Sequence, residues 1–286
     1  MRKYLILKKD GNDLFFKNDE NVKSYFKNKN LLFRIIKKIG LPLNIFFGDW
    51  KYELNNIDKV IFFDNGYNPQ ISKYIKSKNK DIRCVFWYWN SLIEYNNEII
   101  KDENIDEIWT YNRFDAIKYG LKYNPQFYLL DNNKSESKEE NNKKAIYLGR
   151  NKGRLNEINF IKDMLEKNNV ECNFFVIEKE DELMGYEEYI ERLMNSDIVV
   201  DVSKNTASGL SLRPLEALFT KKKLITNNTD IINYDFYHKN NIFVIGVDDK
   251  EKINDFLKTD YYDISDDVLN FYSYKCWLER ILQDKK

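Results

Sequence analysis

The chain has few of the residues on which several common kinds of site depend. Its 286 residues include one histidine, His238, and three cysteines, Cys84, Cys172 and Cys276, which lie far apart. A cluster of histidine ligands is therefore excluded, and the cysteines lack the paired spacing of a zinc site or a disulfide framework. We expect core cysteines in a reducing compartment, and no bound metal or other cofactor.

Two further absences restrict the partners. Lys and Arg together number 46, and Asp and Glu also number 46, so the chain carries no net charge. A general nucleic-acid-binding protein would need a strongly positive surface, so we expect no nucleic acid among the partners. No run approaches the roughly 20 apolar residues of a membrane span, and the first residues lack the apolar core of a signal peptide. These features predict a cytoplasmic protein.

What the chain does contain is a repeated alternation of strand-like and helix-like segments. Strands are predicted at 3–7, 59–64, 83–89, 107–111, 127–130, 145–148, 171–177, 198–202, 223–226 and 242–245, and helices at 22–39, 70–78, 113–119, 155–167, 187–195, 250–257 and 267–283. Such alternation implies parallel sheets. The polar, charged segment 131–144 interrupts it and is either a linker between domains or a solvated loop within one domain. The pattern predicts an α/β fold with two doubly wound domains.

The most informative segment is 203–228, SKNTASGLSLRPLEALFTKKKLITNN. A β-branched strand precedes it, Ser208 and Gly209 allow a tight turn, and Pro214 falls in the first turn of a helix. The helix N-terminus would therefore face the end of a central parallel strand and attract an anion. Glu216, about one turn into the helix, could accept hydrogen bonds from ribose hydroxyls, although an exposed helix position would also explain it.

At SGLSLRPLEAL and KKLITNN the chain resembles the carboxyl-terminal donor domain of GT-B glycosyltransferases, especially bacterial enzymes that build lipopolysaccharide and capsular polysaccharide. The resemblance covers about 143–246. It implies two Rossmann-like domains, 1–135 on the acceptor side and 143–266 on the nucleotide-sugar side, facing each other across a cleft. In that fold a final helix crosses back to the first domain, and 267–286 would do so here unless it is an ordinary terminal helix. Ser208 stands where the retaining branch has the first of two glutamates, so a retaining or inverting outcome stays open.

The resemblance also assigns donor contacts. A Gly-Arg turn followed by lysine supplies charge to the donor diphosphate in the family, and here Gly149, Arg150, Lys152 and Arg154 follow a short apolar strand. An ordinary basic surface loop is the alternative. The other predicted donor contacts are Ser208, Gly209, Leu210, Arg213, Glu216, Thr226 and Asn227. For Arg213 a surface salt bridge is the alternative to a phosphate contact. Charge compensation by the protein would make transfer independent of a metal.

Two strand ends in the first half are candidates for the acceptor side. Asp64 and Gly66 lie at the end of one apolar strand, and Trp89 and Asn90 lie at the end of another. Asp64 could act as general base on an acceptor hydroxyl, or could cap a turn. Trp89 could stack on a sugar ring and Asn90 could hydrogen-bond at the reacting centre, although such aromatics also fill cores.

A basic amphipathic segment at 30–39 (NLLFRIIKKI) completes the list of candidates. It could lie on the anionic inner face of the plasma membrane, near a lipid-linked acceptor, or pack on the sheet through the same apolar face. The leading function is transfer of a sugar from a nucleotide-sugar donor to a saccharide or lipid-linked acceptor in surface polysaccharide synthesis. The alternatives are a sugar-nucleotide epimerase or hydrolase, and a non-catalytic subunit that binds a nucleotide-sugar or a partner.

Overall fold

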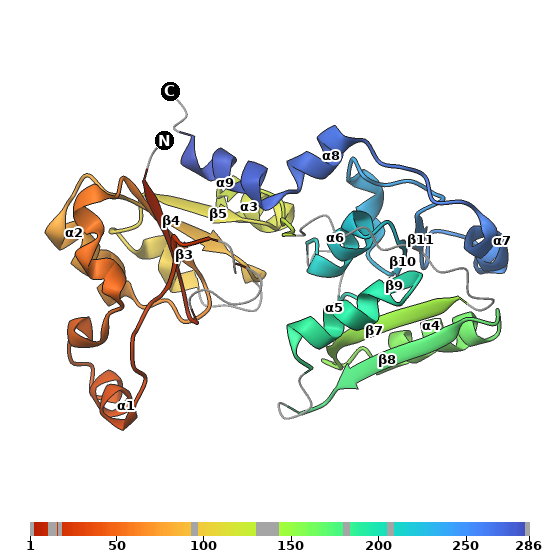
Figure 1. Cartoon of the computed structure of the whole chain (residues 1–286), viewed down its shortest axis with the longest axis horizontal. Helices are drawn as coiled ribbons and strands as arrows, with labels where there is room; N and C mark the ends of the chain where they lie inside the picture. The colour runs from red at the N-terminus through yellow and green to blue at the C-terminus, as the bar shows by residue number, and fades with distance from the viewer. Residues whose placement is uncertain are drawn as a thin grey trace. The chain divides into compact units, whose positions relative to one another are not determined.

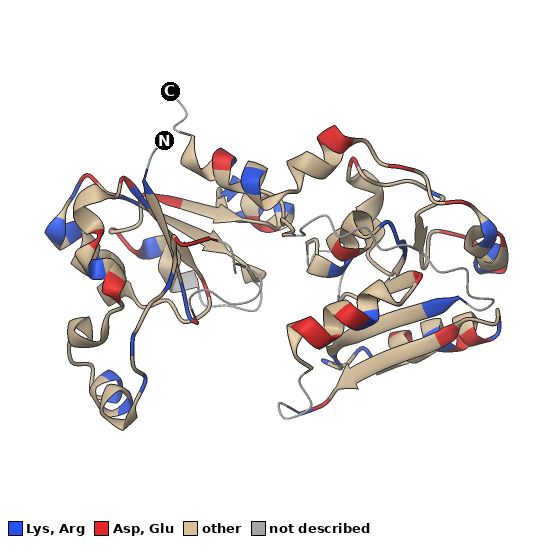
Figure 2. Cartoon of the chain, viewed as in Figure 1, with Lys and Arg blue, Asp and Glu red and all other residues tan. Residues whose placement is uncertain are grey.

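The computed structural model describes residues 3–10, 16, 19–92, 97–129, 143–179, 184–204 and 209–283. The chain divides into two compact units, the first comprising Met1–Pro125 and Glu279–Lys286 and the second Gln126–Leu278. Each unit is built around its own parallel sheet (Figure 1), and charged residues are spread over both (Figure 2). The architecture is α/β with two parallel sheets, compatible with the expected two-domain Rossmann-like fold.

The first unit contains a six-stranded sheet in the order β2-β1-β3-β4-β5-β6, with every pair parallel. Its strands are β1 (Tyr4–Lys8), β2 (Val22–Ser24), β3 (Lys59–Phe63), β4 (Arg83–Tyr88), β5 (Glu107–Thr110) and β6 (Lys122–Tyr123). Its helices are α1 (Leu31–Lys38), α2 (Pro69–Lys78) and α3 (Arg113–Tyr119), with 3-10 turns at Asn44–Phe46, Asp49–Tyr52, Leu54–Asn56 and Asn97–Lys101. Every residue of β3 is buried, as expected for a strand covered on both faces.

The second unit contains a five-stranded parallel sheet in the order β11-β10-β9-β7-β8. Its strands are β7 (Lys144–Arg150), β8 (Glu171–Ile177), β9 (Ile198–Asp201), β10 (Lys223–Thr226) and β11 (Ile242–Val244). Its helices are α4 (Leu155–Glu166), α5 (Tyr186–Met194), α6 (Leu212–Phe219), α7 (Ile253–Lys258), α8 (Asp266–Phe271) and the first part of α9 (Tyr274–Leu282), with 3-10 turns at Thr229–Asn233 and Lys250–Lys252.

Both sheets have the same order when their strands are numbered within each unit. The first strand lies between the second and the third, so the chain winds toward one edge and then toward the other. The point where the order reverses lies between β1 and β3 in the first unit and between β7 and β9 in the second. Ligands of open parallel sheets bind at the carboxyl ends of the strands at such a point.

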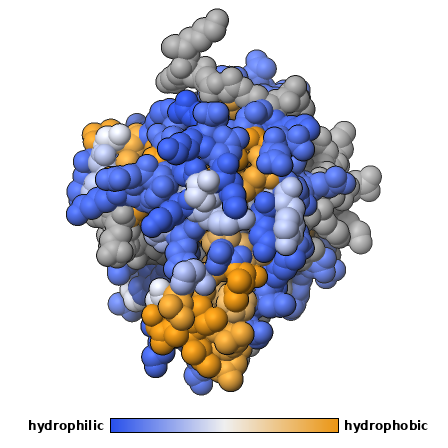
Figure 3. Space-filling model, turned by 90° about the vertical axis from the view of Figure 1, so that its left-hand side faces the viewer, coloured by the Kyte–Doolittle hydropathy of each residue, from blue (hydrophilic) through white to orange (hydrophobic). Residues whose placement is uncertain are grey.

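The predicted helix at 22–39 is wrong in its first part. Val22–Ser24 forms β2, because it pairs in parallel with β1, and the helix begins only at Leu31. Asn30 caps that helix by accepting a hydrogen bond from the backbone N–H of Phe33. Only Phe33 is buried on α1, and its other large apolar side chains contribute to an apolar surface patch (Figure 3).

Two other predicted elements differ from the structure. The predicted strand at 127–130 does not join a sheet: Tyr128 forms an isolated bridge with Ser273, and residue 130 lies outside the described residues. The same bridge interrupts the predicted helix at 267–283. Tyr128 accepts from the N–H of Tyr274 and donates to the carbonyl of Tyr272, so the helix is split into α8 and α9. The division between the units falls inside α9, and most of the polar segment 131–144 is not described.

Candidate functional site

Strands β7 and β9 separate near their carboxyl ends. They pair only at Ala145 with Ile198 and at Ile146 with Val199, although β7 continues to Arg150. Two arginines occupy the space that opens between them. The reversal point of the second sheet is therefore lined by guanidinium groups.

Arg213, on α6, ties the two strands together. Its Nε donates to the carbonyl of Leu148 at 3.0 Å, and its Nη1 lies 3.1 Å from Oδ1 of Asp201. The guanidinium also lies over the ring of Tyr147, 5.3 Å from the centroid. The predicted phosphate contact of Arg213 stays a prediction, because the observed contacts are with the strands.

Arg154 also bridges the separated ends of β7 and β9 by hydrogen bonds. Its Nε donates to the carbonyl of Asn151 at 3.2 Å and its Nη1 to the carbonyl of Val202 at 2.5 Å, just after β9. Its Nη2 donates to the carbonyl of Arg150. Arg154 thus fixes the backbone of the loop in which Arg150 and Lys152 are exposed. Lys152 and Gly153 both adopt positive φ, 45° and 78°, so this loop turns sharply.

Asp201, which the sequence analysis did not select, is the polar centre of this region. It is 1% exposed, and it accepts hydrogen bonds from Ser211 Oγ at 2.8 Å, Arg213 Nη1 and Thr226 Oγ1 at 3.2 Å. A buried carboxylate is tolerated when such partners compensate its charge. The sequence feature that could have identified Asp201 is the presence of an acidic residue at the end of an otherwise apolar strand.

Gly149 packs so closely against Arg213 that a larger residue would not fit without displacing it. A Cβ atom at this position would lie 2.6 Å from Arg213 Nη2 and 2.8 Å from the Tyr147 hydroxyl. That hydroxyl is buried and has no hydrogen-bond partner among the described residues, and burial raises its pKa. Gly149, Tyr147 and Arg213 are therefore closely packed at the end of β7.

The turn before α6 is described from Gly209 onward. Ser208 lies outside the described residues, Gly209 has φ 75°, and Leu210 is fully buried. Pro214 is in the first turn of α6, as predicted. Ser211 occupies the N-cap position without a capping side-chain bond, because its hydroxyl donates to Asp201.

Glu216 is not on an exposed face of α6. Its side chain is buried at 3% exposure, and the hydroxyl of Tyr189, on α5, donates to its Oε2 at 2.5 Å. Burial raises the pKa of Glu216 to about 7, against the opposing effects of the Tyr189 hydrogen bond and the Arg213 charge. The Glu216 charge in turn contributes, after burial, to a raised pKa of Tyr128, whose hydroxyl accepts from Tyr186 at 3.2 Å. Sequence alone gave no sign of this tyrosine environment.

Thr226 and Asn227 join the end of β10 to the end of β9. Thr226 bonds Asp201, while Asn227 Oδ1 accepts from the N–H of Ser203 at 2.7 Å and its Nδ2 donates to the Ser203 carbonyl at 3.0 Å. Both predicted donor residues therefore lie at the carboxyl edge of the sheet, beside the arginines.

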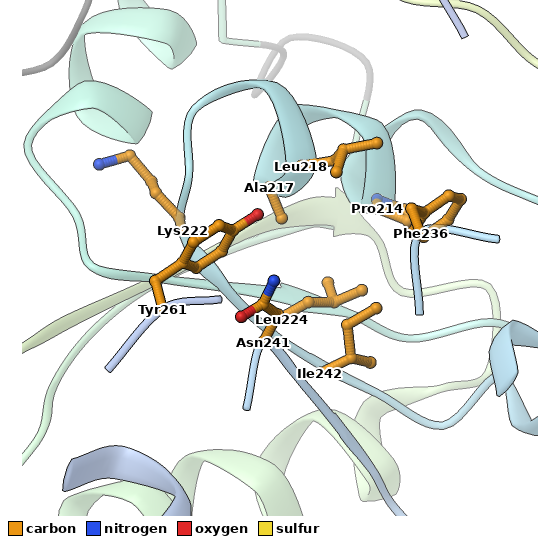
Figure 4. Close-up of a pocket in the computed structure, with 9 residues that line it drawn as sticks. All are labelled: Pro214, Ala217, Leu218, Lys222, Leu224, Phe236, Asn241, Ile242 and Tyr261. Atoms are coloured by element: carbon orange, nitrogen blue, oxygen red, sulfur yellow. The ribbon is translucent and has the colours of Figure 1, made fainter. Parts of the chain in front are cut away.

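A small, mainly apolar pocket lies elsewhere in the second unit (Figure 4). Ala217 and Leu218 of α6 line it together with Leu224 and Ile242, which belong to the first halves of β10 and β11. It therefore lies toward the amino ends of the strands, away from the arginines. We interpret it as a packing void under α6.

In the first unit the structure brings two predicted residues into contact. Asp64, just after β3, accepts hydrogen bonds at Oδ2 from Asn90 N at 3.0 Å and Asn90 Nδ2 at 2.9 Å. Its Oδ1 accepts from the N–H of Asn65 at 2.8 Å, so it also caps a turn. Burial raises the pKa of Asp64, and these hydrogen bonds oppose that rise.

Gly66 and Trp89 flank this pair. Gly66 has φ 81°, and a Cβ there would come within 3.0 Å of the Lys9 side chain, so the position favours glycine. Trp89 is half-buried, with its ring 5.5 Å from Phe63 and 5.3 Å from Trp87. The aromatic side chains of β4 are fully buried and fill the core, whereas the ring of Trp89, just after the strand, is partly exposed.

Comparisons with known proteins give no family. The chain matches no family model, and no curated protein matches it. Among the residues described, no three or more His, Cys, Asp or Glu side chains are grouped in a way that could hold a metal ion. No helix within the described ranges is both long and apolar enough to cross a bilayer.

Proposed function

We propose that the chain is a GT-B glycosyltransferase that moves a sugar from a nucleotide-sugar to a saccharide or lipid-linked acceptor in bacterial surface polysaccharide synthesis. The observation that carries the proposal is the cationic reversal point of the second sheet, where Arg154 and Arg213 bridge the separated ends of β7 and β9. A diphosphate is the ligand that such a position and charge fit best.

In this proposal the arginines have two kinds of role. Arg154 and Arg213 position the strand ends, because their guanidinium groups bond backbone carbonyls and Asp201. The exposed Arg150 and Lys152 would contact the diphosphate and stabilise it as it leaves, without a metal. Glu216, whose Oε2 is bonded to Tyr189, would meet a ribose hydroxyl through Oε1.

The acceptor side would use Asp64 as the base that takes a proton from the acceptor hydroxyl. A carboxylate whose pKa is raised by burial is a stronger base than an ordinary one, which suits that role. Asn90 would hold the carboxylate in place, and Trp89 would stack on the acceptor sugar. One observation favours a non-catalytic binding subunit instead: both Asp64 oxygens already accept hydrogen bonds from Asn65 and Asn90.

The test is calorimetric titration of the full chain with UDP, GDP, CMP, ADP and dTDP. We expect one nucleotide to bind, and Arg150→Ala to weaken it at least about tenfold, since a hydrogen bond to a charged group contributes roughly 1.5–3 kcal/mol. Arg192→Ala is the matched control, because Arg192 is an exposed arginine of the same unit that pairs with Glu188. Binding of no nucleotide, or an equal loss in both variants, would refute the donor site.

Turnover then separates the function classes. A glycosyltransferase should consume the sugar-nucleotide only when an acceptor is present, and Asp64→Asn should lower kcat. Acceptor-independent conversion would indicate an epimerase or hydrolase. Tight binding without transfer across a broad acceptor panel would indicate the non-catalytic subunit.

A further inference from the structure

The first unit exposes a group of large apolar side chains that its own fold does not cover. Four come from α1 and its C-cap and two from the following segment: Leu31, Leu32, Ile35, Ile39, Leu41 and Ile45, here called the α1 surface. Their exposed fractions range from 48% for Ile35 to 73% for Leu31. Scattered exposed apolar residues are ordinary, but six within fifteen consecutive positions form a patch (Figure 3).

The helix has three distinct faces. At ~100° per residue, Leu31, Leu32, Ile35 and Ile39 fall within an arc of roughly 100°. Phe33 and Ile36 lie on the next arc and contact the core. The basic residues Arg34, Lys37 and Lys38 fill the remaining arc and adjoin the apolar face at Leu31. The exposed apolar face is thus separate from the face that packs on the protein.

Aromatic contacts hold this helix on the unit. The Phe33 ring lies 4.8 Å from the Phe26 ring and 5.4 Å from the Phe46 ring. The alternative that the apolar face of 30–39 packs on the sheet is therefore wrong for most of its residues. Phe33 and the partly buried Ile36 make the contact with the core, and the α1 surface stays outside.

The charged residues of the segment that carries the α1 surface all have one sign. Residues 21–48 contain six Lys or Arg and no Asp or Glu, in a chain with no net charge. In Figure 2, α1 carries the colour of Lys and Arg and not that of Asp and Glu. Lys23, Lys27 and Lys29 form ion pairs with acidic residues outside 21–48. Within the described part of the chain, Arg34, Lys37 and Lys38 form no ion pair.

We propose that the α1 surface binds the surface of a bilayer rich in anionic lipid. An apolar face flanked by uncompensated cations is complementary to acyl chains beneath a layer of negative headgroups. The exposed apolar side chains would enter the boundary between headgroups and chains, while Arg34, Lys37 and Lys38 would remain at headgroup depth. The assignment concerns the first unit alone and does not rest on the nucleotide-sugar proposal.

The experiment is co-sedimentation of the full chain with phosphatidylcholine vesicles, with and without phosphatidylglycerol. Two variants test the two parts of the surface: Leu32→Ser with Ile35→Ser, and Arg34→Gln with Lys37→Gln and Lys38→Gln. The matched control is Ile117→Ser, since Ile117 on α3 is 82% exposed in the same unit. All changes are at exposed positions, and circular dichroism checks that each variant is folded.

We expect binding to the anionic vesicles, weakened by added salt, and little binding to phosphatidylcholine alone. Each test variant should lower the partition coefficient at least about tenfold, since one basic residue near an anionic surface contributes roughly fivefold. The control should bind as the wild type does. Absence of binding, equal binding to both vesicles, or an equal loss in the control would overturn the proposal. Self-association that Leu32→Ser with Ile35→Ser abolishes, without lipid binding, would assign the surface to a second copy of the chain instead.

Discussion

The two sheets share one strand order but place different chemistry at the same position. The third strand of each unit ends at a buried aspartate, Asp64 after β3 and Asp201 at the end of β9. Asp64 is surrounded by amide donors from Asn65 and Asn90, whereas Asp201 is paired with the guanidinium of Arg213. The charge of Asp201 is compensated and that of Asp64 is not. One topological position therefore provides a structural centre in one unit and a carboxyl with a raised pKa in the other.

The fourth strands extend the comparison. A residue at the exit of each fourth strand donates a hydrogen bond to the aspartate of the neighbouring third strand. Asn90, after β4, donates to Asp64, and Thr226, at the end of β10, donates to Asp201. Each unit thus links the exits of its third and fourth strands with a short side chain. The difference between the units lies in the helix between the third and fourth strands, which supplies Arg213 in the second unit.

The largest effect should come from removing the compensated aspartate. Asp201→Ala leaves the Arg213 guanidinium without its carboxylate and should cost about 3–5 kcal/mol of unfolding free energy. Asp64→Ala removes hydrogen bonds to neutral amides and should cost about 1–3 kcal/mol. Guanidinium unfolding followed by circular dichroism measures both. Equal losses would show that the two aspartates are energetically alike, contrary to the comparison.

A second, smaller effect concerns Glu216, the buried acid of the second unit whose pKa is raised to about 7 from an ordinary 4.5. The folded state then holds the proton more tightly than the unfolded state. The contribution of protonated Glu216 to the free energy of unfolding is therefore lost as pH rises from about 4.5 through about 7, by up to about 3 kcal/mol.

Glu216→Gln should remove this dependence. The variant should match the wild type near pH 5 and exceed it in melting temperature near pH 8, with Glu188→Gln, on the exposed side of α5, as the control. A variant that is less stable than the wild type at both pH values would show that the carboxylate form is the one the fold requires.

The smallest effect concerns the glycine under Arg213. Gly149→Ala must displace the guanidinium, because the added Cβ would lie 2.6 Å from Nη2, and it should cost about 1–2 kcal/mol. Gly185→Ala adds a Cβ with no atom within 4 Å and should cost less, about 0.5 kcal/mol, because alanine is a poorer N-cap for α5 than glycine. Thermal melts compare the two. If Gly149→Ala cost no more than Gly185→Ala, close packing at Gly149 would not fix the position of Arg213.

Much of the sheet architecture was predictable because buried parallel strands are nearly continuous apolar runs. β3, β4, β9 and β10 are of this kind, and their predicted positions agree with the structure to within two residues. The two wrongly predicted elements have a common physical reason. Val22–Ser24 became a strand, and 127–130 did not become one, because partners distant in sequence, Ile6 and Ser273, decide their pairing.

The candidate site was predictable to a similar degree. Residues at strand exits, such as Asp64, Asn90, Arg154 and Thr226, could be found from local pattern, and the structure places them at the exits. Their roles could not be found, because a guanidinium that bonds backbone carbonyls and one that binds a ligand have the same sequence signal. The link between Tyr189 and Glu216 spans 27 residues, and no local pattern marks it.

The first unit is completed by residues from the end of the chain, and this has a consequence for synthesis of the protein. Lys59, at the start of β3, is buried, and its Nζ donates at 2.8 Å to the carbonyl of Ile281, 222 residues later in the chain. At a ribosomal rate of roughly 5–20 residues per second, that carbonyl is made about 10–45 s after the lysine. The nascent first unit therefore spends that interval with an unfinished interior, while the whole of the second unit is being translated. The unit made first is the last to be completed.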